Sequence, residues 1–235
     1  LEKFGAERVS DTIVSVDIEG PVKTLVGSNG TYKARTLIIA TGAFPRPIGC
    51  KGEGEFMGKG VSYCATCDGM FYRDKTVVVV GGGDTAAADA VFLSKICKKV
   101  YLVHRRDALR ASKAYLSPLQ RCENVEFVWN TTVEEILAQE KVTAVAVKNV
   151  KSGAYTMIDC DGVFVAVGNV PNTKLVQGQV ALNAGGYIAA GESTKTNIPG
   201  VFAAGDVREK PLRQVVTAVS DGAVAAKFAE EYLSE

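Results

Sequence analysis

Two cysteines separated by two residues lie shortly before a glycine-rich segment, and both features can carry redox chemistry. Cys64 and Cys67 form a Cys-x-x-Cys pair in the segment CATCDG. Such a pair can close a disulfide when it lies in a turn or at the start of a helix. Asp68 follows directly, and its carboxyl group can supply the proton that a departing thiolate needs. A dithiol beside a dinucleotide-binding turn predicts an oxidoreductase.

Two alternative interpretations exist for this segment. The cysteines could form half of a zinc site, which requires two further Cys or His ligands at matching spacing. The only histidine of the chain, His104, lies in an arginine-rich segment, and the other cysteines are scattered at positions 50, 97, 122 and 160. We therefore expect no metal site. For Asp68, the alternative is a helix cap.

The glycine-rich turn follows the apolar run Val77–Val80 and precedes an alanine-rich stretch that predicts a helix from about Thr85 to Ser94. Gly81-x-Gly83-x-x-Ala86 matches the dinucleotide fingerprint: the first glycine allows a tight turn, the second lets a pyrophosphate approach, and the alanine permits close helix packing. A purely structural turn is the alternative, which the flanking elements disfavour. The predicted pyrophosphate-binding residues are Gly81, Gly82, Gly83, Asp84, Thr85 and Ala86.

Arginines follow the second predicted strand, Val100–Val103, where NAD-binding proteins place an acidic residue on the ribose. Guanidinium groups pair bidentately with phosphate, so this cluster could bind the 2′-phosphate of NADPH. The alternative is a solvated basic patch. The arginines follow the glycines by about twenty positions in the sequence, which is the spacing expected of a residue that contacts the coenzyme ribose, and this favours a coenzyme-binding role. The predicted 2′-phosphate residues are His104, Arg105, Arg106 and Arg110.

Composition limits the partners. The chain has 27 Lys and Arg residues and 26 Asp and Glu residues. The net charge of +1 gives no strong electrostatic attraction to nucleic acid or to an anionic membrane. The hydrophobic content is 47%, yet no apolar run approaches the roughly 20 residues that a membrane-spanning helix needs. We expect a soluble cytoplasmic protein that binds neither. Its 235 residues are enough for two domains.

Two further strand ends carry small residues where a cofactor could approach closely. Thr41 and Gly42 follow the apolar run Leu37–Ala40, and Gly205-Asp206 follows Val201–Ala204. Ordinary strand-to-loop turns explain both equally well. The prolines and glycines between residues 45 and 60 predict a hinge or linker, and a second linker is expected near residues 169–172.

Five motifs occur in a diagnostic order: CATCDG at 64–69, GGGDTA at 81–86, HRRD at 104–107, GDV at 205–207 and RQV at 213–215. The chain resembles the low-molecular-weight bacterial-type thioredoxin reductases in these motifs, over nearly its whole length. The resemblance implies an α/β fold with two Rossmann-like domains, one for FAD and one for NADPH. It also implies a homodimer whose domains rotate relative to each other, with thioredoxin as the disulfide partner.

The resemblance assigns roles to matching positions. Cys64 and Cys67 become the redox pair and Asp68 the general acid, while the glycine turn and the arginine cluster hold NADPH. FAD would contact two strand ends and the segment before the last helix, through Thr41, Gly42, Gly205, Asp206, Arg213, Gln214 and Val215. The implied domains are a partial FAD-binding domain, residues 1–45 and 168–235, and an NADPH-binding domain, residues 46–167, that carries the redox motif.

One departure from the family pattern concerns FAD. Members carry an early Gly-x-Gly-x-x-Gly turn for the adenosine diphosphate of FAD, and no such turn precedes Thr41. We therefore expect an N-terminally incomplete FAD domain and a chain that by itself binds little or no FAD. Two alternative functions stay open: the flavoprotein reductase of an alkyl hydroperoxide system, and a catalytically inactive fragment that binds NADPH but no FAD.

Overall fold

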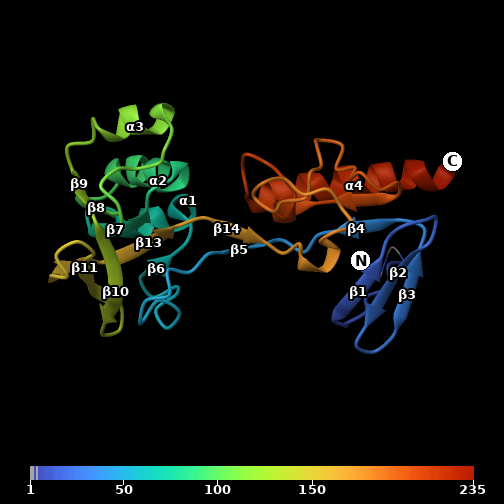
Figure 1. Ribbon diagram of the computed structural model, residues 1–235, viewed down its shortest axis with the longest axis horizontal. Helices are drawn as coiled ribbons and strands as arrows, with labels where there is room; N and C mark the ends of the chain where they lie inside the picture. The colour runs from blue at the N-terminus through green and yellow to red at the C-terminus, as the bar shows by residue number, and fades with distance from the viewer. Residues whose placement is uncertain (1–2, 4) are drawn as a thin grey trace. The chain divides into compact units, whose positions relative to one another are not determined.

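The computed structural model describes residue 3 and residues 5–235, and the chain divides into two compact units. Unit 1 comprises Leu1–Phe44 and Val170–Glu235, and unit 2 comprises Pro45–Asn169. Where the chain passes between the units, strands β5 (Ala43–Pro45) and β14 (Asn169–Pro171) pair with each other (Figure 1). Which cofactor each unit binds stays a prediction.

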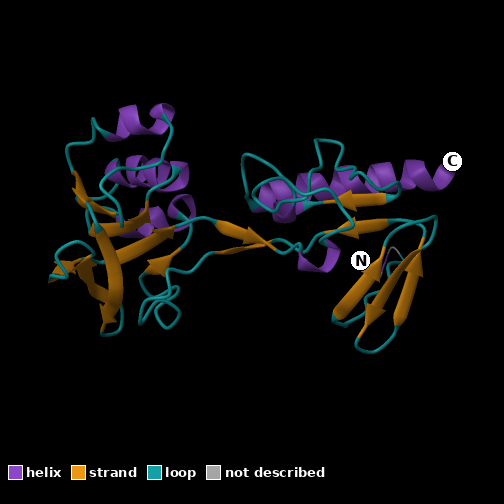
Figure 2. Ribbon diagram, viewed as in Figure 1, coloured by secondary structure: helices purple, strands orange, loops and turns teal. Residues whose placement is uncertain are grey.

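Unit 2 contains a five-stranded parallel sheet in the order β6-β13-β7-β8-β9. Strands are drawn in orange in Figure 2. The strands are β6 (Val61–Ser62), β13 (Gly162–Ala166), β7 (Thr76–Gly81), β8 (Lys99–Val103) and β9 (Val125–Val128). Helix α2 (Asp84–Ser94) connects β7 to β8, and α3 (Lys113–Leu119) lies between β8 and β9. This is the βαβ unit that the sequence predicts around the glycine turn.

The parallel sheet is buried on both faces. Alternate side chains of β7 enter different cores: Val77 and Val79 pack with α2 and α3, whereas Val78 and Val80 pack against an antiparallel meander. The meander consists of β10 (Thr131–Ala138), β11 (Val142–Asn149) and β12 (Tyr155–Asp159). Burial on both faces explains why β7 is a continuous run of valines, and it fixes the end of that strand from which the glycine turn emerges.

Unit 1 contains two smaller sheets. Strands β1 (Ile13–Asp17), β2 (Lys23–Gly27) and β3 (Thr31–Ala34) form an antiparallel sheet, and β4 (Leu37–Ile39) pairs in parallel with β15 (Val201–Ala203). The 3₁₀ turns are η3 (Lys174–Val176) and η4 (Gly205–Val207). Helix α4 (Val215–Ser234) packs Ala225 and Ala229 against Phe202 of β15.

None of the helices within the described residues has the length and apolar character to span a membrane.

The segment between residues 46 and 60 differs from the expected linker because it packs onto unit 2. The buried carboxylate of Glu53 accepts hydrogen bonds from the backbone amides of Ile48 and Gly49 at 3.0 and 2.7 Å, and from the hydroxyl of Tyr63 at 2.8 Å. Phe56 packs against the meander core. A carboxylate that organises this many donors turns a glycine-rich segment into an ordered loop.

A short helix in unit 2 begins directly after Cys64 and contains Cys67. Helix α1 (Ala65–Asp68) continues as the 3₁₀ turn η2 (Gly69–Tyr72). Tyr72 packs edge to face on Phe164 of β13, with ring centroids 5.2 Å apart, and the Cys-x-x-Cys segment is thereby attached to the parallel sheet.

Candidate redox and coenzyme sites

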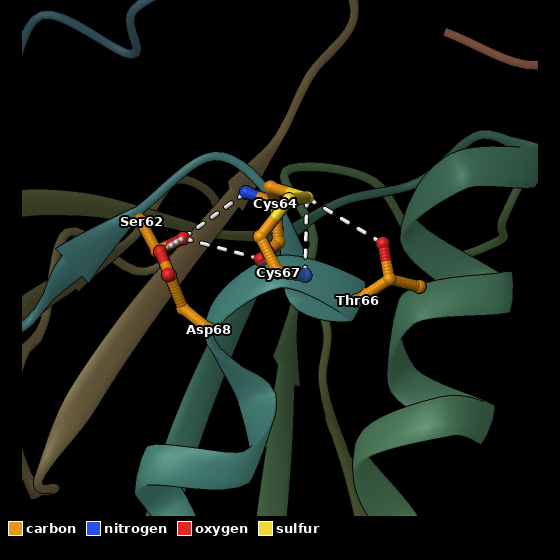
Figure 3. Close-up of a disulfide and its surroundings, with 5 residues drawn as sticks. All are labelled: Ser62, Cys64, Thr66, Cys67 and Asp68. Carbon is orange, nitrogen blue, oxygen red and sulfur yellow. Dashed lines mark hydrogen bonds between the residues drawn. A yellow bond between two sulfur atoms is a disulfide. The ribbon is translucent and has the colours of Figure 1, made fainter. Parts of the chain in front are cut away.

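Cys64 and Cys67 are joined by a disulfide whose Cα atoms lie 5.3 Å apart (Figure 3). Cys64 is the N-cap of α1, and the backbone N–H of Cys67 donates to its Sγ atom at 3.2 Å. The hydroxyl of Thr66 lies 3.4 Å from the same sulfur. An N–H directed at a sulfur at a helix start stabilises the thiolate that reduction produces.

The carboxylate of Asp68 is linked to the backbone of Cys64 through Ser62, a residue that the sequence did not indicate. The hydroxyl of Ser62 donates to Asp68 Oδ2 at 2.6 Å and accepts the backbone N–H of Cys64 at 3.0 Å (Figure 3). The N–H of Asp68 bonds the carbonyl of Cys64 at 3.1 Å. Within residues 3 and 5–235 there is no group of three or more His, Cys, Asp or Glu that could hold a metal ion.

The glycine turn between β7 and α2 is shaped by close contacts on one side and open space on the other. A Cβ atom on Gly81 would lie 2.3 Å from the carbonyl oxygen of Ala166 and 2.7 Å from the Cβ of Ala86. Gly83 is the N-cap of α2, and a Cβ atom there would meet nothing within 4 Å. The start of α2 is therefore open at Gly83, and the unpaired backbone amides of a helix N-terminus suit an anionic group.

His104 packs directly under this turn. A Cβ atom on Gly82 would lie 2.1 Å from the His104 ring, so only glycine leaves room for the imidazole. His104 is buried, and its Nε2 atom has no hydrogen-bond partner among the described residues. Burial lowers the pKa of His104, which keeps the ring neutral at physiological pH. An unpaired buried nitrogen is a polar group still available to a ligand.

The arginine loop, residues 105–111, follows β8 and lies beside the turn. Arg105, Arg106 and Arg110 are all exposed. The backbone N–H of Arg110 donates to the carbonyl of Gly82 at 2.7 Å, and the carbonyl of Arg106 accepts the N–H of Asn130 at 3.0 Å. The backbone of this loop is thus held on the turn at Arg110 and on Asn130 at Arg106, while its guanidinium groups are exposed to an anion.

The FAD residues predicted from the resemblance all lie in unit 1. Ala204, which follows β15, donates its N–H to Ile39 of β4 at 2.9 Å, so the carboxyl ends of both strands lie together. Gly42 follows β4 and accepts the N–H of Asn172 at 2.9 Å, and the hydroxyl of Thr41 donates to the Asn172 carbonyl at 2.7 Å. Cofactors bind at such edges of parallel sheets.

The turn after β15 and the start of α4 carry two buried polar atoms with no hydrogen-bond partner among the described residues, Asp206 Oδ1 and Arg213 Nε. The guanidinium of Arg213 stacks on the ring of Tyr187, 4.0 Å from its centroid. Gln214 is the N-cap of α4, and Val215 next to it is 81% exposed. Unsatisfied buried polar atoms beside an exposed apolar residue suit a ligand that is both polar and aromatic.

A buried ionic cluster, which sequence reasoning missed, fixes the turn that carries Asp206. Asp221 of α4 accepts hydrogen bonds from Arg208 Nη2 at 2.6 Å, Lys210 Nζ at 2.6 Å and the Gly205 N–H at 2.9 Å. All three side chains are at least nine-tenths buried. The carboxylate therefore joins the first turns of α4 to η4.

We predict that Asp221→Ala destabilises the protein by about 3–5 kcal/mol, because it leaves two buried cations without their counter-charge. Denaturant unfolding measures this loss. Glu192→Ala is the matched control, since Glu192 lies 3.6 Å from Arg208 but is 94% exposed, and it is expected to have no measurable effect. Equal effects of the two substitutions would contradict a stabilising role for the buried cluster.

The same carboxylate predicts how stability depends on pH. Burial by itself raises the pKa of Asp221, but the hydrogen bonds from the two cations and the backbone outweigh it and hold the pKa at about 2, below the ordinary 3.8. A depressed folded-state pKa means that the stabilisation is present above about pH 4 and is lost as the pH falls towards 2. Asp221→Ala should therefore destabilise less at pH 2 than at pH 7.

Comparisons with known proteins place the chain in a family. Residues 3–222 match the family model described as pyridine nucleotide-disulphide oxidoreductase. A thioredoxin reductase of Peptoclostridium litorale is 49% identical over 241 residues, which cover 100% of this chain and 76% of the relative. One from Listeria innocua is 46% identical and is covered to 74%.

Two solved structures are also similar. The thioredoxin reductase of Streptococcus pyogenes superposes with a TM-score of 0.91 at 42% identity, over 99% of this chain and 76% of that one. The enzyme of Giardia duodenalis gives a TM-score of 0.93 at 40% identity, over 100% and 78%. The chain therefore belongs to the pyridine nucleotide-disulphide oxidoreductases, as a member of the bacterial-type thioredoxin reductases. The family and the α/β fold predicted from the sequence are confirmed, and the enzyme class of this family is NADPH-dependent flavoprotein disulfide oxidoreductase.

Proposed function

We propose that the protein transfers electrons from NADPH through FAD to the Cys64–Cys67 disulfide, and from the resulting dithiol to the disulfide of thioredoxin. The observation that carries this proposal is the disulfide itself, held at the start of α1 with Asp68 tied to it through Ser62. A glycine turn open to an anion lies in the same unit. The family relationship supports both cofactors and the partner.

NADPH fits the turn and the arginine loop of unit 2. The first amides of α2 and the open space at Gly83 suit the pyrophosphate. His104 Nε2 is an unused polar atom on the ring that packs at Gly82, and the exposed arginines suit the 2′-phosphate. The proposed NADPH residues are Gly81, Gly82, Gly83, Asp84 (through its backbone N–H and not its carboxylate), Thr85, Ala86, His104, Arg105, Arg106 and Arg110.

FAD fits the unpaired polar atoms of unit 1, because Asp206 Oδ1 can accept from a ribityl hydroxyl and Arg213 Nε can donate to a carbonyl or ring nitrogen. When bound, FAD supplies a two-electron relay between the nicotinamide and the disulfide. The proposed FAD residues are Thr41, Gly42, Gly205, Asp206, Arg213, Gln214 and Val215. The homodimer implied by the family and the cytoplasmic location expected from the composition stay predictions.

The dithiol chemistry follows from thiol–disulfide exchange. One thiolate of the reduced pair attacks a sulfur of the thioredoxin disulfide, forming a mixed disulfide and releasing a thioredoxin thiolate that takes up a proton. The second cysteine, as a thiolate, then attacks the mixed disulfide, releases the other thioredoxin thiolate and re-forms the Cys64–Cys67 bond. Two electrons pass to thioredoxin, and each released thiolate gains one proton. Asp68, within hydrogen-bonding reach of Ser62, is the acid closest in sequence to the sulfurs.

We predict that Asp68→Asn lowers kcat for thioredoxin reduction by about 100-fold or more, because it removes the proton donor for the departing thiolate. Steady-state assays with NADPH and thioredoxin measure the loss. The affinity for NADPH should stay the same, since the hydrogen bond of the Asp68 carboxylate is made with Ser62 and not with a residue of the glycine turn. Asp74→Asn is the matched control, because Asp74 is an exposed aspartate at φ 58°, a conformation that asparagine also tolerates. A kcat that is reduced equally in both variants would rule out the acid role.

A coupled assay separates this function from its alternatives. NADPH oxidation by the flavin-loaded enzyme should depend on oxidised thioredoxin, and the peroxidase partner of an alkyl hydroperoxide system should not replace it. A strict preference for that partner would favour the alternative. Flavin absorbance near 450 nm, stoichiometric or absent in the purified chain, decides whether it is a flavoprotein or a fragment that binds only NADPH.

A further inference from the structure

The arginine loop is attached to the coenzyme turn at three points. The ring of His104, just before the loop, fills the space over Gly82. The N–H of Arg110 donates to the Gly82 carbonyl at 2.7 Å. The third point lies just after the loop, where the N–H of Ser112 donates to Asp84 Oδ1 at 2.6 Å.

The third contact depends on the carboxylate of Asp84, a side chain that is unfavourable for binding a phosphate. Asp84 is the first residue of α2, so its negative charge lies at the helix end where a pyrophosphate would bind. A carboxylate there repels phosphate, although it also interacts favourably with the helix dipole. Asp84 Oδ1 accepts the N–H of Ser112, the residue that follows the arginine loop. The carboxylate at this position therefore holds the end of the loop and need not contact the pyrophosphate.

We propose that Asp84 is a positioning residue for coenzyme discrimination: through Ser112 it holds the arginine loop in place for the 2′-phosphate of NADPH. This inference rests on the proposed binding of NADPH by Arg105 and Arg106. It goes further by assigning the choice between NADPH and NADH partly to a residue that does not touch the 2′-phosphate. Removing the acceptor frees the end of the loop, while removing the charge relieves repulsion at the pyrophosphate.

Two opposite effects therefore give a signature that simple loss of structure does not produce. In Asp84→Ala, affinity for 2′,5′-ADP, which carries the 2′-phosphate, should fall about tenfold or more, as expected for one lost hydrogen bond to a charged group. Affinity for ADP, which carries the pyrophosphate and no 2′-phosphate, should stay the same or rise. Asp84→Asn keeps an oxygen acceptor and should retain the affinity for 2′,5′-ADP.

Ser112 allows the same contact to be removed from the other side. Its φ of −66° is the angle that proline adopts, so Ser112→Pro deletes the donated N–H with little change of backbone at that residue. Ser112→Pro should reproduce the loss seen in Asp84→Ala, whereas Ser112→Ala keeps the N–H and should not. In the variant that combines Asp84→Ala with Ser112→Pro, the losses should not add, because both remove one contact.

Isothermal titration calorimetry of the purified protein with 2′,5′-ADP and ADP makes the test, with NADP⁺ and NAD⁺ as confirmation. Equal weakening of both nucleotides in Asp84→Ala, or unchanged affinity for 2′,5′-ADP, would overturn the proposal. Additive losses in the combined variant would overturn it as well. The double substitution Arg105→Ala with Arg106→Ala separates the two hypotheses: if it leaves 2′,5′-ADP binding intact, the proposed coenzyme site itself is wrong.

Discussion

Replacing either Cys64 or Cys67 by serine is expected to abolish NADPH-dependent reduction of thioredoxin, with a loss of at least about 10³-fold in kcat. A hydroxyl cannot form the mixed disulfide, and a single remaining sulfur cannot close the Cys64–Cys67 bond that releases the product. NADPH oxidation in the presence of oxidised thioredoxin measures the loss. Turnover retained in either variant would reject the redox role of the pair.

The other cysteines provide the control for this experiment. Burial raises the pKa of Cys50 and Cys97 to about 11 and that of Cys160 to about 12, so these thiols are poor nucleophiles at neutral pH. Cys122 is half-buried, and its sulfur accepts a hydrogen bond from Ser94. Cys122→Ser keeps a group that can take that bond and should retain full activity.

Replacing Arg105 and Arg106 together by alanine is expected to raise KM for NADPH by at least about 100-fold, because each guanidinium can form hydrogen bonds to the 2′-phosphate that are worth about 1.5–3 kcal/mol. KM for NADH should change little, since NADH has no 2′-phosphate. Steady-state kinetics with both coenzymes measures the ratio, and raising the ionic strength should reduce the NADPH preference of the unmodified enzyme.

Arg121→Ala is the matched control for the arginine pair. Arg121 lies in the same unit after α3, and its Nε atom donates to the Ser117 carbonyl at 3.2 Å. It should leave both KM values unchanged. Equal increases for NADPH and NADH in the double variant would mean that the arginines contribute general affinity and do not recognise the 2′-phosphate.

Local sequence patterns predict strand β7, its glycine turn and helix α2 well, because the residues that indicate them are consecutive in the chain. The valine run, the glycines and the alanine-rich helix follow one another within residues 76–94, and the structure has β7, its turn and α2 there. The alternation that predicts strands is weaker where it is interrupted. Strand β10 was missed because a bulge between Val133 and Glu135 breaks its alternation, and α3 was missed because Pro118 lies inside it.

The sequence did not indicate Ser62 and Asp221 because each contacts residues that belong to another element of the fold, outside any local motif. Ser62 reaches Asp68 from a two-residue strand. Asp221 meets Arg208 and the Gly205 amide across 13 and 16 positions. Contacts of this kind depend on how α4 packs on η4 and on how β6 ends beside α1, so only the folded chain brings them together.

The segment between residues 46 and 60 illustrates the same limit in the opposite direction. Its glycines and prolines are typical of a linker, but buried Glu53 holds its backbone and Phe56 joins the meander core. A glycine- and proline-rich composition indicates that a segment can be flexible. Whether the folded segment is ordered depends on buried groups, such as Glu53, that hydrogen-bond its backbone.

Anaerobic addition of one equivalent of NADPH to the flavin-loaded enzyme without thioredoxin, followed by alkylation and peptide mass spectrometry, tests most directly where the electrons go. Our account predicts that Cys64 and Cys67 become alkylated together, with up to one pair opened per NADPH oxidised, while Cys50, Cys97 and Cys160 keep the labelling they show without NADPH. Complete oxidation of NADPH with the Cys64–Cys67 disulfide still closed would contradict it.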